Sequence, residues 1–481
     1  MKRSALAALL LCLCAGALCA GLSLGRPGAV KKRVSKLDAR AAAFRAAGAA
    51  QAALNQPPVV SAVTAAYPTV AAGGLTSISV SALDPDGDTL SYIWSSTAGA
   101  IGGTGASINW LAPSTAGVYA VACAVSDGKN PVSRSVSITA VPPGTLHWKF
   151  TASANISLSP AVGPDGTVYA ADDTGRLYAI NPADGSQKWA FKTENSDVIN
   201  FPPVVGGDGT VYVVAAGTKT YAVNPAGGKK WGPSPVVPAN NISNRPVLNP
   251  DGGVYILDGT AHALYVLDQA TGLGQSTFTA LAGIAQPPVT GPDGTLYVTD
   301  TLDNLYSIAP GQSLSNASIM SVPAISYPPA IGRDGSVYWE DNLYDLNASK
   351  PDGSAKWSPY STAQTIAAPP VIGADGAVYV FTATPDVLTV SSVTGSGQSF
   401  TSLMGVAYAP VIGPDGSVYL VDSPGDLYAE SPGGAFKWGP AGVQAPATAI
   451  NSAPAVSAGG AVYFPSDDNK IYAVYGASAL P

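Results

Sequence analysis

Residues 160–169 read PAVGPDGTVY, and the pattern of this stretch recurs eight times along the C-terminal two thirds of the chain. Most copies place a proline and two apolar residues before a Gly-x-Asp-Gly element, and all end with an apolar residue and a tyrosine. The copies end at Tyr169, Tyr212, Tyr255, Tyr297, Tyr338, Tyr379, Tyr419 and Tyr463. Their spacing of 40 to 44 residues indicates a repeated unit of about four strands.

The first repeat shows how four strands arise. A short strand at 160–162 reaches a Pro-Asp-Gly turn and returns at 167–171, and a second apolar-tyrosine pair follows at 177–178. A glycine turn and a last strand complete the unit, and in several repeats this strand carries a tryptophan: Trp189, Trp231, Trp357 and Trp438. Eight such units predict an all-β, eight-bladed β-propeller over residues 144–481.

The two ends of the repeat array complement each other. Residues 146–150 form a spare strand with Trp148 before the first repeat, whereas the eighth repeat ends without a tryptophan strand of its own. We therefore expect residues 146–150 to pair with the last repeat and close the ring, which removes the unpaired strand edges of an open array.

Residues 57–142 show a different pattern of short alternating strands, expected at 76–83, 90–95, 107–111, 118–126 and 132–141. Gly, Pro and Asp turns separate these strands, which predicts a small β-sandwich with Trp94 in its core. The run DPDGDTLSYIW at 84–94, with VSDG at 125–128, resembles PKD and related immunoglobulin-like domains of bacterial surface proteins. The resemblance implies an N-terminal immunoglobulin-like (PKD-like) β-sandwich.

The N-terminus has the composition of an export signal. Lys2 and Arg3 precede an uncharged, Leu- and Ala-rich stretch from Ser4 to Gly25. A cleaved signal peptide over residues 1–25 is the first interpretation, and an uncleaved membrane anchor is the second. Lipid attachment at Cys19 is disfavoured because Leu18 stands where a small residue is required. Residues 26–56 then read as an Ala-rich basic linker.

Charge separates the N-terminal segment from the rest. Residues 1–54 carry nine Lys or Arg against one Asp, whereas the remaining residues carry 15 positive and 30 negative side chains. An acidic body repels phosphate backbones, so nucleic acid is not an expected partner. We expect a monomer that is secreted or associated with the cell envelope and meets the membrane only through its N-terminal segment. Cys123, the only cysteine after Cys19, is expected to be a small buried hydrophobic residue.

The repeat also carries a family resemblance. Residues 177–191 read LYAINPADGSQKWAF, which resembles the repeat of quinoprotein-type β-propellers. That family includes pyrroloquinoline-quinone alcohol dehydrogenases and a lipoprotein subunit of the outer-membrane β-barrel assembly machinery. The resemblance covers residues 144–481 and implies the fold, but it leaves the function open because the repeat residues build blades rather than sites.

The enzymatic interpretation lacks the residues that it needs. Family dehydrogenases carry an adjacent Cys pair over the quinone, a Ca²⁺ held by acidic and amide side chains, and a catalytic Asp. Residues 144–481 contain no Cys and only three Arg for a tricarboxylate cofactor. His147 and His262 are the only histidines, and neither lies in a nucleophile motif or at metal-ligand spacing. We expect no enzymatic activity and no bound cofactor other than Ca²⁺.

Two sets of aspartates allow a calcium hypothesis. The Gly-x-Asp-Gly elements are better explained as turns, in which Asp bonds its own backbone; they contain Asp165, Asp208, Asp251, Asp293, Asp334, Asp375 and Asp415, with Gly459 in the eighth copy. In the sandwich, Asp84, Asp86, Asp88 and Asp127 lie in two loops expected at the same end of the fold. Their carboxylates would suit Ca²⁺, and the alternative is a solvated Asp-Gly turn.

The function predicted from these features is that of a non-catalytic, exported binding or scaffold protein whose propeller binds a protein or glycan. One alternative is a lipoprotein resembling the outer-membrane protein assembly factor. A quinone-dependent dehydrogenase is a further, disfavoured alternative.

Overall fold

The structure is a computed structural model. It describes residues 38–43, 45, 55–216, 219–233, 242–250, 252–279, 283–284, 286–310, 318–321, 325, 327–373, 375–382, 386–401, 407–422, 424–439 and 449–476. Residues 1–25, for which a signal peptide is predicted, lie outside these ranges. No helix in the described ranges is both long enough and apolar enough to cross a membrane.

The chain forms two compact units. The first contains Val80–Ile93, Cys123–Arg134 and the described part of Met1–Val63, and the second contains Thr64–Ser79, Trp94–Ala122 and Ser135–Pro481. Described residues 38–43 are helical, a 3-10 turn occupies Glu194–Ser196, and the remaining elements are strands. The predicted all-β fold is therefore confirmed.

Residues 59–141 form two four-stranded sheets. The first has the order β1-β3-β6-β5, with β1 (Val59–Ala65), β3 (Leu75–Leu83), β6 (Ser107–Leu111) and β5 (Ala100–Gly102). The second has the order β2-β8-β7-β4, with β2 (Thr69–Ala71), β8 (Val132–Val141), β7 (Gly117–Ser126) and β4 (Ser91–Ser96). Buried and exposed residues alternate along β3 and β6, so one face of that sheet is apolar. The five predicted strands agree with the structure to within one residue at each end.

The structure corrects the prediction that Trp94 lies in the core of this region. Trp94 lies on β4, at the edge of its sheet, and is only half-buried; its indole donates a hydrogen bond to the Gly105 carbonyl at 2.8 Å. Trp110 on β6 is completely buried instead. An edge strand has a neighbour on one side only, so its side chains are covered less well. Cys123 is buried and free, as predicted.

Residues 146–475 contain eight further four-stranded antiparallel sheets among the described residues, numbered here as sheets 1 to 8 in chain order. Sheets 1 to 4 consist of β10 (Ala161–Val162), β11 (Val168–Ala171), β12 (Arg176–Ile180), β13 (Gln187–Lys192); β14 (Val204–Val205), β15 (Val211–Ala215), β16 (Lys219–Val223), β17 (Lys229–Trp231); β18 (Val247–Leu248), β19 (Gly253–Asp258), β20 (Ala263–Asp268), β21 (Gly274–Thr279); and β22 (Val289–Thr290), β23 (Leu296–Thr299), β24 (Asn304–Ile308), β25 (Ser318–Ser321). Sheets 5 to 8 consist of β26 (Ala330–Ile331), β27 (Val337–Glu340), β28 (Asp345–Ser349), β29 (Tyr360–Ser361); β30 (Ile366–Ile372), β31 (Val378–Thr382), β32 (Asp386–Val390), β33 (Gly397–Thr401); β34 (Val411–Ile412), β35 (Val418–Val421), β36 (Leu427–Glu430), β37 (Phe436–Trp438); and β38 (Ala455–Val456), β39 (Ala461–Ser466), β40 (Lys470–Tyr475), β9 (Leu146–Thr151).

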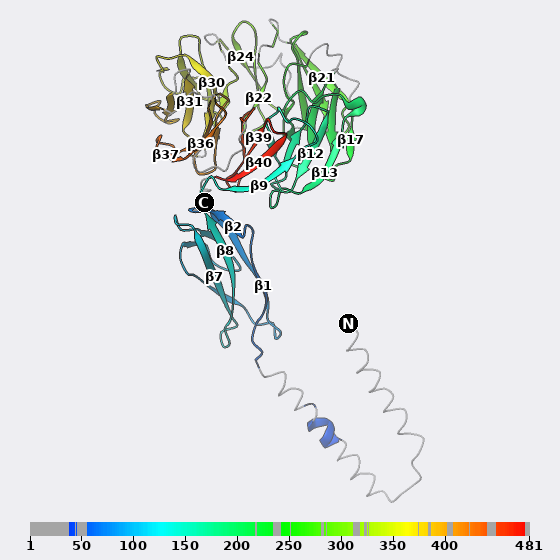
Figure 1. Cartoon of the computed structure of the whole chain (residues 1–481), viewed down its shortest axis with the longest axis vertical. Coiled ribbons are helices and arrows are strands. Elements are labelled where there is room, and N and C mark those ends of the chain that lie inside the picture. The colour runs from blue at the N-terminus through cyan, green and yellow to red at the C-terminus, as the bar shows by residue number, and fades with distance from the viewer. Residues whose placement is uncertain are drawn as a thin grey trace, which may run out of the picture. The chain divides into compact units, whose positions relative to one another are not determined.

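The predicted pairing of residues 146–150 with the last repeat is confirmed. Strand β9 pairs antiparallel with β40, and Trp148 lies opposite Ala473. Figure 1 shows β9 in cyan beside β40 in red, although more than 300 residues separate them in the sequence. The last sheet is thus built from both ends of the repeat region.

Successive sheets bury apolar side chains against one another. One cluster joins sheets 1 and 2 through residues such as Leu177 and Val213, and comparable clusters join each later pair up to sheets 7 and 8. A further cluster packs Trp148 and Phe150 of sheet 8 against Tyr178 of sheet 1. The hydrophobic effect therefore couples every sheet to its neighbours, including the last to the first.

The repeated tryptophans explain why the repeat also requires a glycine. Trp148 covers Gly185 of the next sheet, where an added Cβ would come within 2.8 Å of the indole and where φ is +73°. Its indole nitrogen donates to the Pro182 carbonyl at 2.8 Å. The same contact recurs in the pairs Trp189–Gly227, Trp231–Gly272, Trp357–Gly395 and Trp438–Gly144. The tryptophan of one repeat thus docks on a glycine turn of the next.

Candidate functional site

The aspartates of the Gly-x-Asp-Gly elements act within their own turns. In sheet 1, Asp165 accepts the Thr167 amide at 3.0 Å and the Thr167 hydroxyl at 2.7 Å. Equivalent amide bonds reach Asp208, Asp293, Asp334, Asp375 and Asp415. The turn interpretation is supported because these bonds occupy the carboxylate oxygens that a calcium ladder would need.

A lysine on the outer strand, or just before it in the case of Lys356, joins the turn in several sheets, which the sequence did not predict. Lys356 contacts Asp334 at 2.7 Å and also donates to Ser336 at 2.8 Å. The same arrangement links Lys188 to Asp165, Lys230 to Asp208 and Lys437 to Asp415. Partial burial acts to raise the pKa of Asp334, but the hydrogen bonds from Lys356 and Ser336 outweigh it and lower the pKa to about 2.

Burial decides how much each of these ion pairs stabilises the fold. The Asp415 side chain is 3% exposed, whereas that of Asp165 is 58% exposed. We expect Asp415→Ala to lower the free energy of unfolding by about 3 kcal/mol. The substitution leaves Lys437 and the two turn donors of Ser417 without the carboxylate that they bond. The matched variant Asp165→Ala should cost about 1 kcal/mol or less. Urea unfolding of both variants measures this, and equal losses would show that burial does not control these pairs.

The acidic loops of the first unit are tied together by hydrogen bonds. Asp86 accepts the amide and side chain of Gln56, at 2.6 Å and 3.0 Å, while Asp127 accepts the side chain of the adjacent Asn55. Asp84 accepts the amides of Asp86 and Asp88 at 2.8 Å and 3.2 Å. Adjacent residues therefore connect the two predicted loops. No group of three or more His, Cys, Asp or Glu in the described ranges is placed to hold a metal ion.

Calcium binding at Asp84, Asp86, Asp88 and Asp127 stays a prediction with a direct test. If Ca²⁺ binds residues 55–143 with Kd near 0.1 mM, 1 mM calcium should stabilise them by about 1.4 kcal/mol and raise Tm by roughly 6–11 °C. Asp84→Asn with Asp86→Asn should abolish the increase measured by calorimetry. An unchanged Tm for the wild-type segment at 1 mM calcium would show that the predicted calcium site is wrong.

Two turns of the propeller region expose large apolar side chains. Leu302 lies between β23 and β24 and is 71% exposed, and Leu343 lies between β27 and β28 and is 68% exposed. Tyr344 follows and is 42% exposed. Leu305 and Trp339, which flank these turns, pack in one cluster between sheets 4 and 5. We call Leu302, Leu343 and Tyr344 the turn patch.

Buried aspartates hold the turn patch in place. Asp300 accepts the Leu302 amide at 2.9 Å and the Tyr306 hydroxyl at 2.9 Å. Asp341 accepts the Leu343 amide at 2.9 Å and the Asn347 side chain at 2.9 Å. Each exposed leucine is thus presented on a turn whose backbone is fixed from within.

Tyr344 adopts a backbone conformation that tyrosine rarely takes. Its φ is +68°; at the same position equivalent turns have Gly175 and Gly425, but also Asp303 (φ +61°) and Asn469 (φ +64°). A side chain with a Cβ costs on the order of 1 kcal/mol there relative to glycine. Positive φ at this position is a feature of the repeated turn, and Tyr344 differs in placing an exposed aromatic ring there.

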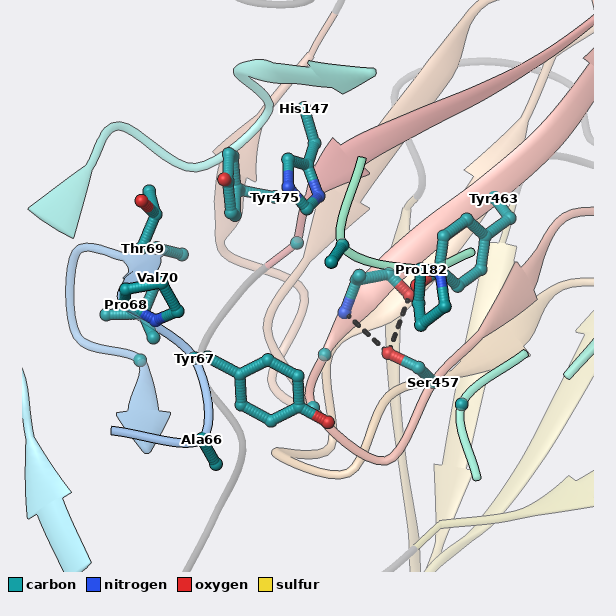
Figure 2. A pocket seen from close by; sticks show the side chains of 18 of the residues that line it. Ala66, Tyr67, Pro68, Thr69, Val70, His147, Pro182, Ser457, Tyr463 and Tyr475 are labelled. Carbon is teal, nitrogen blue, oxygen red and sulfur yellow. Dashed lines mark hydrogen bonds between the residues drawn. The ribbon is translucent and has the colours of Figure 1, made fainter. Parts of the chain in front are cut away.

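A cavity of about 420 Å³ lies at the opposite ends of the strands of sheets 8 and 1, within the second unit. Its wall includes Tyr67, Pro68 and Thr69, the Asp165 turn, and Tyr463 and Tyr475 of sheet 8. Figure 2 labels the tyrosines, Pro68 and Thr69 of this wall, with His147 beside Tyr475. The ring centroids of His147 and Tyr475 are 4.4 Å apart. We call this cavity the tyrosine pocket.

Burial determines the protonation states of His147 and Tyr463, which line the tyrosine pocket. It lowers the pKa of His147, and the backbone hydrogen bond to Ala183 offsets this only in part. It also raises the pKa of Tyr463 to about 12. His147 is therefore neutral at pH 7, and its Nδ1 atom is buried with no hydrogen-bond partner in the described part of the chain. His262 lies in the turn before β20 with φ of +48°, away from this pocket's lining.

Comparisons place the repeats among known proteins. Residues 77–314 match the family model described as outer membrane protein assembly factor BamB. Among solved structures, BamB from Moraxella catarrhalis is 15% identical with a TM-score of 0.37, covering 83% of this chain and 97% of that one. Virginiamycin B lyase from Staphylococcus aureus is 13% identical with a TM-score of 0.43, covering 56% and 93%. A search of curated proteins found no match.

The family match begins within β3 and ends between β24 and β25, the last two strands of sheet 4. It agrees with the resemblance of residues 177–191 to quinoprotein-type repeats. The chain therefore contains BamB-like propeller repeats.

Proposed function

We propose that this protein is a non-catalytic scaffold of the cell envelope that binds other proteins through its propeller. The BamB-like repeats support protein binding, since the matching family is described as an outer membrane protein assembly factor. The single observation that carries the proposal is the turn patch. It combines exposed leucines with a strained tyrosine on turns fixed by buried Asp300 and Asp341.

The proposal includes a finer architecture. The eight sheets would be blades of one closed propeller, because β9 completes sheet 8 and Trp148 packs against sheet 1. Residues 57–142 would be an immunoglobulin-like, PKD-like sandwich, a class to which their two sheets of short strands conform. In a closed propeller, equivalent turns of neighbouring blades present a continuous surface, which suits a protein partner.

The exposed leucines favour a protein partner on physical grounds. Surface leucines scattered singly need no explanation, but two on equivalent turns of neighbouring sheets, one of them followed by an exposed tyrosine, give these turns an apolar character. Rigid presentation reduces the entropy lost on binding, and buried aspartates supply that rigidity here. Tyrosine and leucine at such a site would act as anchors surrounded by polar turn residues.

Capture from detergent-solubilised envelopes of the source cells tests this function. We expect the wild-type protein to retain proteins of the outer-membrane assembly machinery, and Leu302→Asp with Leu343→Asp to reduce their recovery at least tenfold. Phe436→Asp is the matched control, since Phe436 is 53% exposed on β37, outside the turn patch. Equal recovery by the double variant and the control would contradict the proposal, as would failure of the wild type to retain these proteins.

We further propose that the chain lacks quinone-dependent dehydrogenase activity. Residues 144–481 contain no cysteine and three arginines, at positions 176, 245 and 333. A buried tricarboxylate without compensating cations would cost several kcal/mol per charge. Substrate turnover after addition of pyrroloquinoline quinone and Ca²⁺ would restore the enzymatic alternative.

A further inference from the structure

The tyrosine pocket is separate from the turn patch. It uses the turn at Asp165 between β10 and β11, whereas the turn patch uses the turns after the second strand of sheets 4 and 5. Consecutive antiparallel hairpins alternate between the two ends of a sheet, so the two sites lie at opposite strand ends. A ligand of the pocket would therefore be independent of a partner at the turn patch.

The charges that line the tyrosine pocket favour an uncharged ligand. No Lys or Arg lines it, and His147 is neutral, so nothing there would compensate an anion. Its single carboxylate, Asp165, is already hydrogen-bonded to Thr167 and Lys188, so it offers little to a cation. The remaining polar side chains in the wall carry hydroxyls, among them Tyr67 and Thr69, whereas the Ser457 hydroxyl is already bonded to the Ala461 amide at 3.0 Å and carbonyl at 3.4 Å.

The backbone around the tyrosine pocket is already paired. The Ser457 amide donates to the Ala461 carbonyl at 2.9 Å, and the Gly460 amide donates to the Ser457 carbonyl at 2.9 Å. The Tyr475 amide donates to the Thr145 carbonyl at 2.9 Å. An extended peptide gains affinity from free main-chain groups, and these groups are not free. Recognition must instead use ring faces and hydroxyls.

The main ring face comes from Tyr67, which is half exposed, with His147 and Tyr475 partly buried beside it. The Tyr463 ring is completely buried and stacks on Trp148. The Tyr67 ring lies against Gly459, where an added Cβ would be 3.4 Å from it. Sugar rings combine an apolar C–H face, which packs on an aromatic ring, with hydroxyls at the edge. We propose that the tyrosine pocket binds a neutral oligosaccharide. A volume of about 420 Å³ lies within the range of small-ligand pockets.

The sequence of the eighth repeat supports this assignment. Here Ser457-Ala458-Gly459-Gly460 replaces the Gly-x-Asp-Gly element of the other repeats. The change removes a carboxylate and gives the Tyr67 ring its place over the turn. Departures from a repeat's pattern are expected where function rather than folding selects the residue.

Calorimetric titration of the full-length protein with cellotriose, chitotriose and maltotriose tests the proposal. We expect at least one trisaccharide to bind with a stoichiometry of one. Tyr67→Ala should weaken binding at least tenfold by removing the ring, and Gly459→Asp should do the same by restoring the carboxylate of the other repeats. Leu343→Asp, in the turn patch, should bind within twofold of wild type.

Absence of binding by all three sugars at millimolar concentration would overturn the proposal. Wild-type affinity in both pocket variants would overturn it as well, as would displacement of the sugar by hexaproline, which would indicate a peptide site. Since Leu343→Asp tests protein capture and the pocket variants test sugar binding, failure of one proposal is distinguishable from failure of the other.

Discussion

A variant that starts at residue 152, and therefore lacks β9, is expected to lose cooperative unfolding and to aggregate. It loses Trp148 and Phe150 from the cluster between sheets 8 and 1. Truncating a buried aromatic residue costs about 3–5 kcal/mol, so the two losses together approach the total stability of many domains, about 5–15 kcal/mol. The variant also exposes the edge of β40, which then offers unpaired backbone groups to other chains.

A variant that starts at residue 144 is the matched control, because it retains β9 and differs by only eight residues. Thermal unfolding by circular dichroism, with light scattering to detect aggregates, compares the two. The longer variant should melt in one transition. A shorter variant that melts at the same temperature would show that sheet 8 does not depend on β9.

Replacing Glu340 should remove a large pH dependence of stability. Glu340 lies on β27 at a position where other repeats carry residues such as Ala171 and Val421, and it is 1% exposed. Neither carboxylate oxygen has a hydrogen-bond partner among the described residues, and burial raises its pKa to about 9. The folded protein therefore holds a proton that the unfolded chain releases near pH 4.5.

The sign of the effect follows from that proton. The free energy of unfolding is highest below about pH 4.5. It falls by about 1.4 kcal/mol per pH unit as the pH rises from there towards 9, because the unfolded chain has lost a proton that the folded protein keeps. Glu340→Gln should remove this slope and exceed wild type by about 3 kcal/mol at pH 7. Urea unfolding at pH 5, 7 and 9 measures the difference between the two proteins. Parallel pH profiles would show that Glu340 is not protonated in the folded state.

The strands and turns within each repeat were predictable from the sequence. Turn chemistry and alternating apolar residues depend on neighbours in the chain, so the strands at 76–83 and 107–111 and the Asp turns agree with the structure. The role of β9 was predictable too, because the missing strand of the eighth repeat and the spare strand before the first complement each other.

Features that depend on contacts between distant residues were not predictable. Nothing local distinguishes Trp110, which is completely buried, from Trp94 at a sheet edge. The sequence does not show that Glu340 is buried, because its burial depends on side chains that are distant in the chain. The tyrosine pocket joins Tyr67 to Gly459, almost 400 residues later, so only the fold brings its wall together. The turn patch did carry a signal, a tyrosine where equivalent turns have Gly, Asp or Asn.

Site-specific photo-crosslinking in source cells tests the central claim that the turn patch binds a protein. A photo-reactive phenylalanine analogue would replace Leu343 in one protein and Phe436 on β37 in another, since both side chains are exposed. The account predicts a discrete crosslinked protein from position 343 that Leu302→Asp eliminates, and none of the same size from position 436. No crosslink from position 343, or the same crosslinks from both positions, would contradict it.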